Sequence, residues 1–311
     1  GVIGAIVPWN YPLIMAAWKL GPALASGNSV VLKPSEKSPY TALRLAELAV
    51  QAGIPEGVFN VVPGFGHEAG EALALHMDVD AIGFTGSTRI GRRMLACAAE
   101  SNLKRVYNEL GGKSAFVVFN DAKDVAAAAR AAAGSVFYNQ GESCNAPTRL
   151  LVQQDVVPEF MAALQDEARK YLPGDPLDAA TEMGALVDAG QMSTVLGYIH
   201  QGQAEGANLA FGGRRVRTET GGYFVEPTIF EGVRNDMTIA REEIFGPVMA
   251  VLDFEDEAEV IARANATEFG LAAGIFTNNL TRAHRVIAAL EAGTCWINTY
   301  NITPIEMPFG G

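Results

Sequence analysis

Cysteine and histidine are scarce in this sequence, which has three cysteines and four histidines among its 311 residues. Cys97, Cys144 and Cys295 are too few and too widely separated for a disulfide framework or a zinc-binding spacing, so they indicate a reducing compartment such as the cytoplasm. No histidine has a cysteine or an aspartate at a spacing that suggests a catalytic pair or a metal site. Neither a cysteine–histidine protease site nor metal binding is therefore predicted.

Long apolar runs are absent as well, so no membrane-spanning helix is predicted, and no signal peptide opens the chain. The formal net charge of -12 argues against nucleic acid as a partner, because its phosphates would be repelled, whereas a cationic substrate is permitted. The length allows two domains with sizeable cores. Gly1 opens directly into a predicted strand and Gly311 follows no closing element, so we expect a chain that is cut at both ends.

Strands and helices alternate at short spacing through the first third of the chain, which predicts a parallel sheet with crossover helices, an open Rossmann-like α/β domain. Such sheets bind ligands at the carboxyl ends of their strands. A second α/β block begins at Ser114. We therefore expect a nucleotide-binding domain over residues 1–111 and a catalytic domain over residues 112–311, with the boundary near Gly111–Gly112.

Cys144 is the candidate nucleophile. An Ala-rich helix predicted over residues 124–136 is followed by Asn139 and Gly141, which break it and place Cys144 in a loop with a partly exposed thiol. A free cysteine is usually an inert part of the core, and Cys97 and Cys295 fit that interpretation. Cys144 differs, because its neighbours Gly, Glu, Ser and Asn rarely line a hydrophobic core. Glu109, at the end of a predicted strand and before two glycines, is a candidate general base for this thiol.

Two strand ends indicate a nucleotide. Lys33 and Glu36 follow a buried strand where an acidic residue commonly binds the ribose hydroxyls of NAD, and a carboxylate there would repel the 2′-phosphate of NADP. A solvated Lys–Glu pair is the alternative. Gly86 and Ser87 open a helix directly after a strand, a place that favours a pyrophosphate. The usual GxGxxG fingerprint is missing from the sequence.

Two further clusters allow a functional and a structural interpretation. Asn10, in a Trp-Asn-Tyr turn between two prolines, could donate a hydrogen bond to an oxyanion or could satisfy its own turn. Glu243 lies two residues before Phe245, which suits a ribose contact beside an aromatic ring. The alternative is a helix end with surface acids and one core phenylalanine.

Seven motifs follow one another along the chain, namely Pro8-Trp9-Asn10, Lys33-Pro34-Ser35-Glu36, Phe84-Thr85-Gly86-Ser87, Glu109-Leu110-Gly111-Gly112-Lys113, Gly141-Glu142-Ser143-Cys144, Glu242-Glu243-Ile244-Phe245-Gly246-Pro247 and Pro308-Phe309-Gly310-Gly311. In this order they resemble the motifs of the NAD(P)-dependent aldehyde dehydrogenases along the whole chain, although that family is longer at both ends. Within the family, residues 236–239, 298–304 and 137–144 are most similar to the betaine aldehyde, trimethylaminobutyraldehyde and ω-aminoaldehyde branches.

The resemblance implies a role for each matching residue. Cys144 attacks the aldehyde, Asn10 and the Cys144 N–H stabilise the oxyanion, and Glu109 activates the water that releases the acid. Lys19 matches a family lysine near the site. The resemblance also implies a homodimer or tetramer for the complete chain. The residues that match cofactor-binding positions are Trp9, Lys33, Glu36, Gly86, Ser87, Leu110, Glu243 and Phe245.

Four aromatic residues match positions that line the substrate tunnel of the aminoaldehyde enzymes, namely Tyr11, Trp18, Tyr138 and Phe309. Such a cage would attract a trimethylammonium group by cation–π interaction, although aromatic residues also line generic aldehyde tunnels. We therefore expect oxidation of an ω-amino or trimethylammonio aldehyde such as betaine aldehyde. The alternatives are another or broader specificity, such as γ-glutamylaminobutyraldehyde or a semialdehyde, and an inactive fragment that only binds cofactor. Glu109 argues against a CoA-acylating enzyme.

Overall fold

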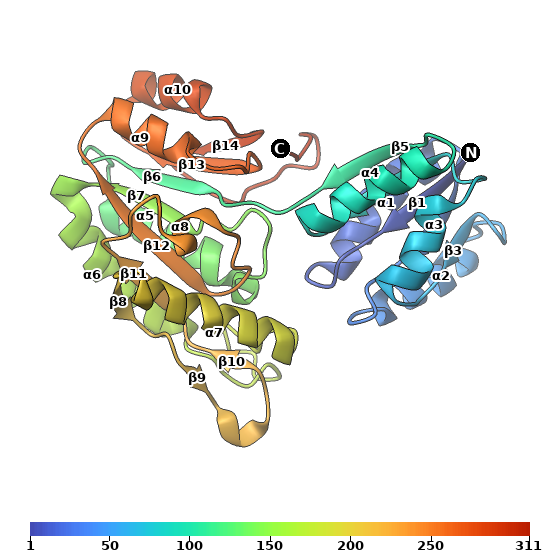
Figure 1. Cartoon of the computed structure of the whole chain (residues 1–311), viewed down its shortest axis with the longest axis horizontal. Coiled ribbons are helices and arrows are strands. Elements are labelled where there is room, and N and C mark those ends of the chain that lie inside the picture. The colour runs from blue at the N-terminus through green and yellow to red at the C-terminus, as the bar shows by residue number, and fades with distance from the viewer. The chain divides into compact units, whose positions relative to one another are not determined.

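The computed structural model describes all residues, 1–311, and they form two compact units, residues 1–110 and residues 111–311 (Figure 1). Both units are α/β, and parallel strands dominate each sheet. The predicted fold class is therefore confirmed. No helix combines the length and the apolar character that crossing a bilayer requires.

The unit over residues 1–110 is built on a five-stranded parallel sheet with the strand order β3-β2-β1-β4-β5. The order reverses between β1 and β4, so the loops that leave these two strands diverge, which is where α/β sheets bind ligands. The strands are β1 (Val2–Ile6), β2 (Ser29–Lys33), β3 (Phe59–Val61), β4 (Ala81–Thr85) and β5 (Arg105–Glu109). The helices are α1 (Pro12–Ala25), α2 (Tyr40–Gln51), the π-helix η1 (Gly66–Gly70), α3 (Glu71–Leu75) and α4 (Thr88–Glu100).

The end of β1 shows how the sequence builds both faces of this sheet. Ala5 and Val7 face the core made with α1 and α2, whereas Ile6 faces the core made with α3 and α4. This alternation follows from the period of two in a strand. Because both faces are covered, the strand is apolar on both sides, as expected for a buried parallel sheet.

The unit over residues 111–311 contains a seven-stranded sheet with the order β14-β13-β6-β7-β12-β11-β8, in which only β8 runs antiparallel to its neighbour. A separate antiparallel hairpin, β9 (Arg215–Val216) with β10 (Phe224–Val225), lies outside it. The strands of the large sheet are β6 (Ala115–Val118), β7 (Arg149–Gln153), β8 (Asn208–Phe211), β11 (Thr228–Glu231), β12 (Val248–Phe254), β13 (Ala272–Phe276) and β14 (Thr294–Ile297).

Helices cover both faces of this sheet (Figure 1). Phe116 and Val118 of β6 face the core made with α5 and α6, whereas Ala115 and Val117 face the core made with α9 and α10. The core of α7 and α8 forms over β11 and β12. The helices are α5 (Val125–Phe137), α6 (Val157–Ala168), α7 (Ala189–Ala204), α8 (Thr238–Arg241), α9 (Glu257–Asn265) and α10 (Leu280–Ala289), and the 3₁₀ turns are η2 (Tyr138–Gly141), η3 (Gln154–Val156), η4 (Arg169–Tyr171) and η5 (Thr218–Thr220).

Helix α5 comes just before the loop that carries Cys144. Asp124 caps its N-terminus, because the side-chain Oδ1 accepts a hydrogen bond from the Ala127 N–H at 2.7 Å. Four alanines of α5 have no exposed surface and let the helix backbone lie close to the sheet and to α6, namely Ala128, Ala129, Ala132 and Ala133. The position of the loop therefore depends on small side chains.

Enlarging one of these alanines tests that dependence. We expect Ala132→Leu to lower the free energy of unfolding by ~1–3 kcal/mol, because added methyl groups in a close-packed core force neighbours to move. Ala162→Leu makes the same chemical change at an exposed position of α6 and should stay within ~0.5 kcal/mol. Urea unfolding of both variants measures the difference. Equal midpoints would show that a larger side chain fits at position 132 without displacing its neighbours.

Candidate active site

Cys144 lies in a constrained loop directly after α5 and η2. It is half-buried and forms no disulfide, whereas Cys97 is completely buried in α4. Just before it, Asn139, Gln140 and Gly141 adopt left-handed φ angles of 50°, 58° and 73°. Such conformations are costly for residues other than glycine and persist only where the surroundings hold them. The loop predicted for Cys144 is therefore present, and it is strained.

Two glycines let other backbone segments approach this loop closely. A Cβ on Gly112 would overlap the carbonyl oxygen of Cys144. A Cβ on Gly141 would overlap the carbonyl of Gly246 and the nitrogen of Pro247. Because any side chain at these glycines would need the backbone to shift, the Cys144 loop lies directly against the Gly111–Gly112 turn and the segment that follows Phe245.

Buried polar side chains tie the same loop to residues 184–187. Glu142 is 2% exposed, and its Oε1 accepts a hydrogen bond from the Val187 N–H at 3.1 Å. Gln140 Oε1 accepts one from the Gly184 N–H at 3.3 Å. A buried carboxylate needs such donors, so these contacts hold the loop against residues 184–187.

Glu243 is brought to the Gly111–Gly112 turn. Its Oε1 accepts a hydrogen bond from the Gly112 N–H at 3.2 Å, and a Cβ on Gly111 would overlap its carboxylate. Burial raises the pKa of Glu243, although the Gly112 N–H and the charge of Lys113 act in the opposite direction. Within residues 111–311 the structure thus gathers Glu243, the glycine turn and Cys144.

Phe245 has a left-handed φ of 55°, and its backbone is held by Gln191 at the start of α7. Gln191 Nε2 donates hydrogen bonds to the carbonyls of Phe245 at 2.7 Å and Ile244 at 3.2 Å. The sequence contains no signal for this contact, because a glutamine early in a helix is ordinary. The left-handed turn sets the direction in which the Phe245 ring leaves the loop.

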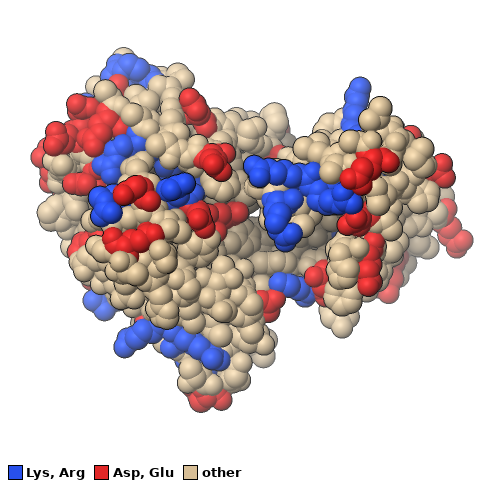
Figure 2. Space-filling view, viewed as in Figure 1, with Lys and Arg blue, Asp and Glu red and all other residues tan.

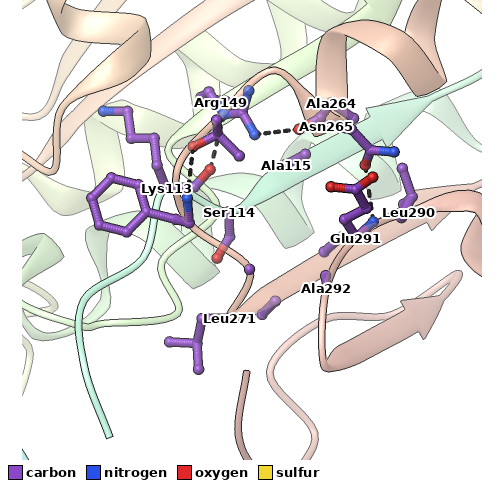
Figure 3. Close-up of a pocket in the computed structure, with 15 residues that line it drawn as sticks. Lys113, Ser114, Ala115, Arg149, Ala264, Asn265, Leu271, Leu290, Glu291 and Ala292 are labelled. Carbon is purple, nitrogen blue, oxygen red and sulfur yellow. Dashed lines mark hydrogen bonds between the residues drawn. The ribbon is translucent and has the colours of Figure 1, made fainter. Parts of the chain in front are cut away.

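Arg149, the first residue of β7, is a fully buried cation (Figure 3). It donates to the Lys113 carbonyl at 2.9 Å through Nε, and to the carbonyls of Ala264 at 2.7 Å and Arg263 at 3.2 Å. Both latter carbonyls belong to the C-terminal turn of α9, the negative end of that helix. Burial nevertheless lowers the pKa of Arg149 to about 10. Arg149 thus fixes the Lys113 carbonyl and the glycine turn before it.

Lys113 lies beside Arg149 and is 1% exposed (Figure 3). Its Nζ makes no hydrogen bond. Burial and the positive charge of Arg149 lower its pKa to about 7, against the opposing charges of Glu243 and Glu242. Sequence reasoning assigned no role to either buried cation; the only available signal was Arg149 at the start of an apolar run.

In residues 1–110, the structure brings Glu109, Thr85 and Lys19 together. Thr85 and Glu109 are paired at the carboxyl ends of β4 and β5. From α1, the alkyl chain of Lys19 passes over Gly83, and its Nζ donates to Thr85 Oγ1 at 2.5 Å. Burial raises the pKa of Glu109, with the charge of Lys19 opposing it. Burial also lowers the pKa of Lys19 to about 8, with Glu109 opposing it.

Lys33 and Glu36 form an ion pair after β2, with 3.3 Å between Nζ and Oε2. Lys33 is buried and Glu36 is exposed. Burial acts to raise the pKa of Glu36, but its own backbone N–H, Lys33 and Lys37 together lower it below the ordinary value. Lys37 also lies over the ring of Trp9, 5.4 Å from its centroid. After β2 the chain thus carries a charged carboxylate, Glu36, and a lysine that lies over the aromatic ring following β1.

Ser87 is the N-cap of α4, and its Oγ accepts a hydrogen bond from the Ile90 N–H at 3.4 Å. Gly86, just before it, packs on the Phe84 ring with no room for a Cβ. Leu110 packs against α4 where that helix has Gly91. Lys and Arg side chains gather over this part of the surface in Figure 2. Helix α4 carries Arg89, Arg92 and Arg93.

Of the aromatic candidates, Tyr11 is the N-cap of α1 and directly follows Asn10, and Trp18 is 42% exposed on the same helix. Tyr138 opens η2 and is 53% exposed. Phe309 is half-buried and packs against the core cluster that Cys144 also contacts. Within residues 111–311, the structure therefore places Phe309 and the Cys144 loop on the same cluster.

A model of the aldehyde dehydrogenase family matches residues 1–311. Betaine aldehyde dehydrogenase from Brucella anthropi is 53% identical over 313 residues. Two solved structures are also similar. The indole-3-acetaldehyde dehydrogenase AldA of P. syringae, in complex with NAD+ and IAA, is 56% identical with a TM-score of 0.99. The gamma-glutamyl-gamma-aminobutyraldehyde dehydrogenase of Burkholderia cenocepacia is 57% identical with a TM-score of 0.98. Each match covers 100% of this chain and 62–64% of the relative.

The buried lysine gives a pH-dependence that can be measured. The pKa of Lys113 is about 7 in the folded chain and 10.5 for an ordinary lysine. Between these values the unfolded chain binds more protons, so the contribution of Lys113 makes stability rise with pH through this window. We expect Lys113→Met to remove that rise and to raise the free energy of unfolding at neutral pH by about 1 kcal/mol or more.

Urea unfolding across the same pH window measures this effect. Lys123→Met is the matched control, because Lys123 is exposed and the change in side chain is identical. If the free energies of unfolding of Lys113→Met and wild type change with pH in parallel, burial does not destabilise the charged form of Lys113. The interpretation of Lys113 then fails.

Proposed function

The chain belongs to the aldehyde dehydrogenase family, and we propose on this premise that the protein oxidises an aldehyde to a carboxylic acid with NAD as the hydride acceptor. The observation that carries the proposal is the half-buried thiol of Cys144, which lies in a strained loop that two glycines allow other backbone segments to approach. Rigid placement of a nucleophile is what attack on a carbonyl carbon requires. The family match over the whole chain supports the same reaction class.

In the proposed mechanism, the Cys144 thiol first loses its proton to solvent. The thiolate Sγ then attacks the aldehyde carbon and forms a thiohemiacetal whose oxygen is an anion. The side-chain amide of Asn10 and the Cys144 N–H donate to the oxyanion, and one such donor is worth about 3 kcal/mol. NAD, when bound, supplies the acceptor for the hydride that leaves this carbon, and a thioester on Cys144 remains. Glu109 then takes a proton from water, which attacks the thioester and releases the acid.

The environment of Glu109 suits a general base. Burial raises its pKa towards the working range, where a base both binds and releases a proton efficiently. Lys19, with a pKa of about 8 and a hydrogen bond to Thr85, is placed to balance the charge of Glu109 as it loses and gains its proton.

The strand ends of residues 1–110 suit an adenine dinucleotide. We assign the ribose hydroxyls to Lys33 and Glu36, and the charged Glu36 carboxylate favours NAD over NADP because it repels a 2′-phosphate. The pyrophosphate is assigned to Gly86 and Ser87 at the N-terminus of α4. Trp9 and Leu110 border this region. Glu243 and Phe245 are assigned to the nicotinamide ribose and ring.

For the substrate we propose an ω-amino or trimethylammonio aldehyde such as betaine aldehyde. The aromatic residues Tyr11, Trp18, Tyr138 and Phe309 support a cationic aldehyde, which the net charge of -12 permits. Broader specificity is the second candidate, because similar proteins are named for indole-3-acetaldehyde and gamma-glutamyl-gamma-aminobutyraldehyde. The three cysteines form no disulfide, which supports a reducing compartment such as the cytoplasm. Assembly as a homodimer or tetramer stays a prediction.

Two substitutions test the chemical steps in the full-length protein. Cys144→Ala should abolish NADH formation and leave NAD binding intact. Glu109→Gln should form about one NADH per site in a burst and then turn over at least ~100-fold more slowly, because hydride transfer needs no water but thioester hydrolysis does. Stopped-flow absorbance and intact-protein mass measure the burst and the acyl adduct.

The alternative of a protein that only binds cofactor makes a different prediction for the same measurements. It would bind NAD without forming an acyl adduct on any aldehyde in a panel of cationic, neutral and indole substrates. A Cys144→Ala variant that kept the wild-type rate would instead disprove the mechanism.

Tyr138 tests the choice of substrate. Tyr138→Leu should lower kcat/KM for betaine aldehyde by ~2- to 30-fold, which corresponds to the loss of one cation–π contact of ~0.5–2 kcal/mol. For 3,3-dimethylbutanal, a neutral molecule of the same shape, the change should be smaller. Tyr40→Leu, at a position that is 82% exposed, is the control. Equal losses for the two aldehydes would favour a generic tunnel.

A further inference from the structure

Asn145, the residue after Cys144, is buried, with only 7% of its surface exposed, and it makes three hydrogen bonds. Its Oδ1 accepts from the Ser143 hydroxyl at 2.8 Å, and its Nδ2 donates to Asn301 Oδ1 at 2.8 Å. Its carbonyl accepts from the Tyr300 hydroxyl at 2.9 Å. Cys144 therefore lies between two residues of one hydrogen-bonded network, whose other members come from the loop after β14.

The Tyr300 ring has little freedom. Its centroid lies 4.4 Å from that of Trp296 and 5.7 Å from that of Phe116. A Cβ on Gly274 would overlap the ring, so only glycine admits it there. Burial raises the pKa of Tyr300, so its hydroxyl stays protonated and can donate throughout the neutral range.

The backbone of this loop is also fixed. Asn298 and Asn301 have left-handed φ angles of 53° and 61°. The Asn298 side chain pairs with the backbone of Thr277 at the end of β13, accepting from its N–H at 3.0 Å and donating to its carbonyl at 2.9 Å. Trp296 Nε1 donates to the Ile302 carbonyl at 2.8 Å. The loop is thus anchored to the sheet on both sides of Tyr300.

We propose that Tyr300, Asn301 and Asn145 form a clamp that positions the Cys144 thiol for attack on the aldehyde. They are positioning residues, since each acts on Cys144 through the peptide and side chains on either side of it. The proposal rests on the proposed function, because it assigns the clamp to the same nucleophile. Sequence reasoning placed residues 298–304 only by similarity to one branch of the family.

The clamp should affect turnover more than cofactor affinity. A nucleophile displaced by ~1 Å can lose ~100-fold in rate. Tyr300→Phe removes the hydroxyl and keeps the ring, so it releases the Asn145 carbonyl without opening a cavity. We expect kcat to fall at least ~10-fold, with KM for NAD unchanged, and we expect iodoacetamide to alkylate Cys144 faster because the loosened loop exposes the thiol.

The experiment uses the full-length protein and measures kcat, KM for NAD, and the rate of Cys144 alkylation by peptide mass spectrometry. Tyr171→Phe is the matched control, because Tyr171 also packs against the α5–α6 core but donates no hydrogen bond to the Cys144 loop. Asn301→Gly removes the oxygen that accepts the hydrogen bond from Asn145 Nδ2, and glycine still tolerates the left-handed φ. Asn301→Asp retains the acceptor and should restore kcat.

The outcomes separate the clamp from the proposed function. A lower kcat, faster alkylation and rescue by Asn301→Asp support the clamp. If Tyr300→Phe and Asn301→Gly keep wild-type kcat and alkylation rates, or lose activity only in proportion to a loss of stability that Tyr171→Phe shares, the clamp is overturned. Since alkylation needs no turnover, it reports on the clamp even if no aldehyde is oxidised, whereas an active Cys144→Ala variant would overturn the proposed function alone.

Discussion

The arrangement around Cys144 depends on close approaches of backbone to backbone that glycine alone permits. Gly112 lies on the Cys144 carbonyl, and Gly141 lies on Gly246 and Pro247. A methyl group at either glycine would separate segments that must touch. Because these contacts involve the chain itself, they constrain the Cys144 loop more firmly than side-chain packing, and they allow the left-handed residues before it to persist.

Burial is the main electrostatic influence on the candidate residues. It is the largest cause of the raised pKa of Glu109 and Glu243, and of the lowered pKa of Lys19 and Lys113. Each group sits near a charge of opposite sign that limits the shift. The result is a set of acids and bases whose proton affinities have moved towards neutrality, the condition under which proton transfer is efficient.

Arg149 shows how the fold tolerates a buried charge without an acidic partner. Three backbone carbonyls, two of them at the end of α9, satisfy its donors. Removing its side chain would take one donor from each of these carbonyls, although the Arg263 carbonyl also accepts from Asn235 Nδ2 and the Ala266 N–H. A helix terminus that is distant in sequence therefore holds the glycine turn in place, and the turn in turn supports both Cys144 and Glu243.

The sequence by itself determined the α/β class, the alternation of strands and helices, and the loop position of Cys144, because hydrophobic period and helix-breaking residues are local signals. It also placed Lys33, Glu36, Gly86 and Ser87 at strand ends. Only the tertiary structure decided that Tyr300 and Asn301 hold Asn145, that Gln191 holds Phe245 and that Arg149 holds Lys113. These contacts join residues that are 36 to 156 positions apart in the sequence. The sequence around a buried tyrosine, glutamine or arginine contains no pattern that identifies its hydrogen-bond partner. The physical reason is that hydrogen-bond partners are selected by packing across elements, which neighbouring residues in the chain do not encode.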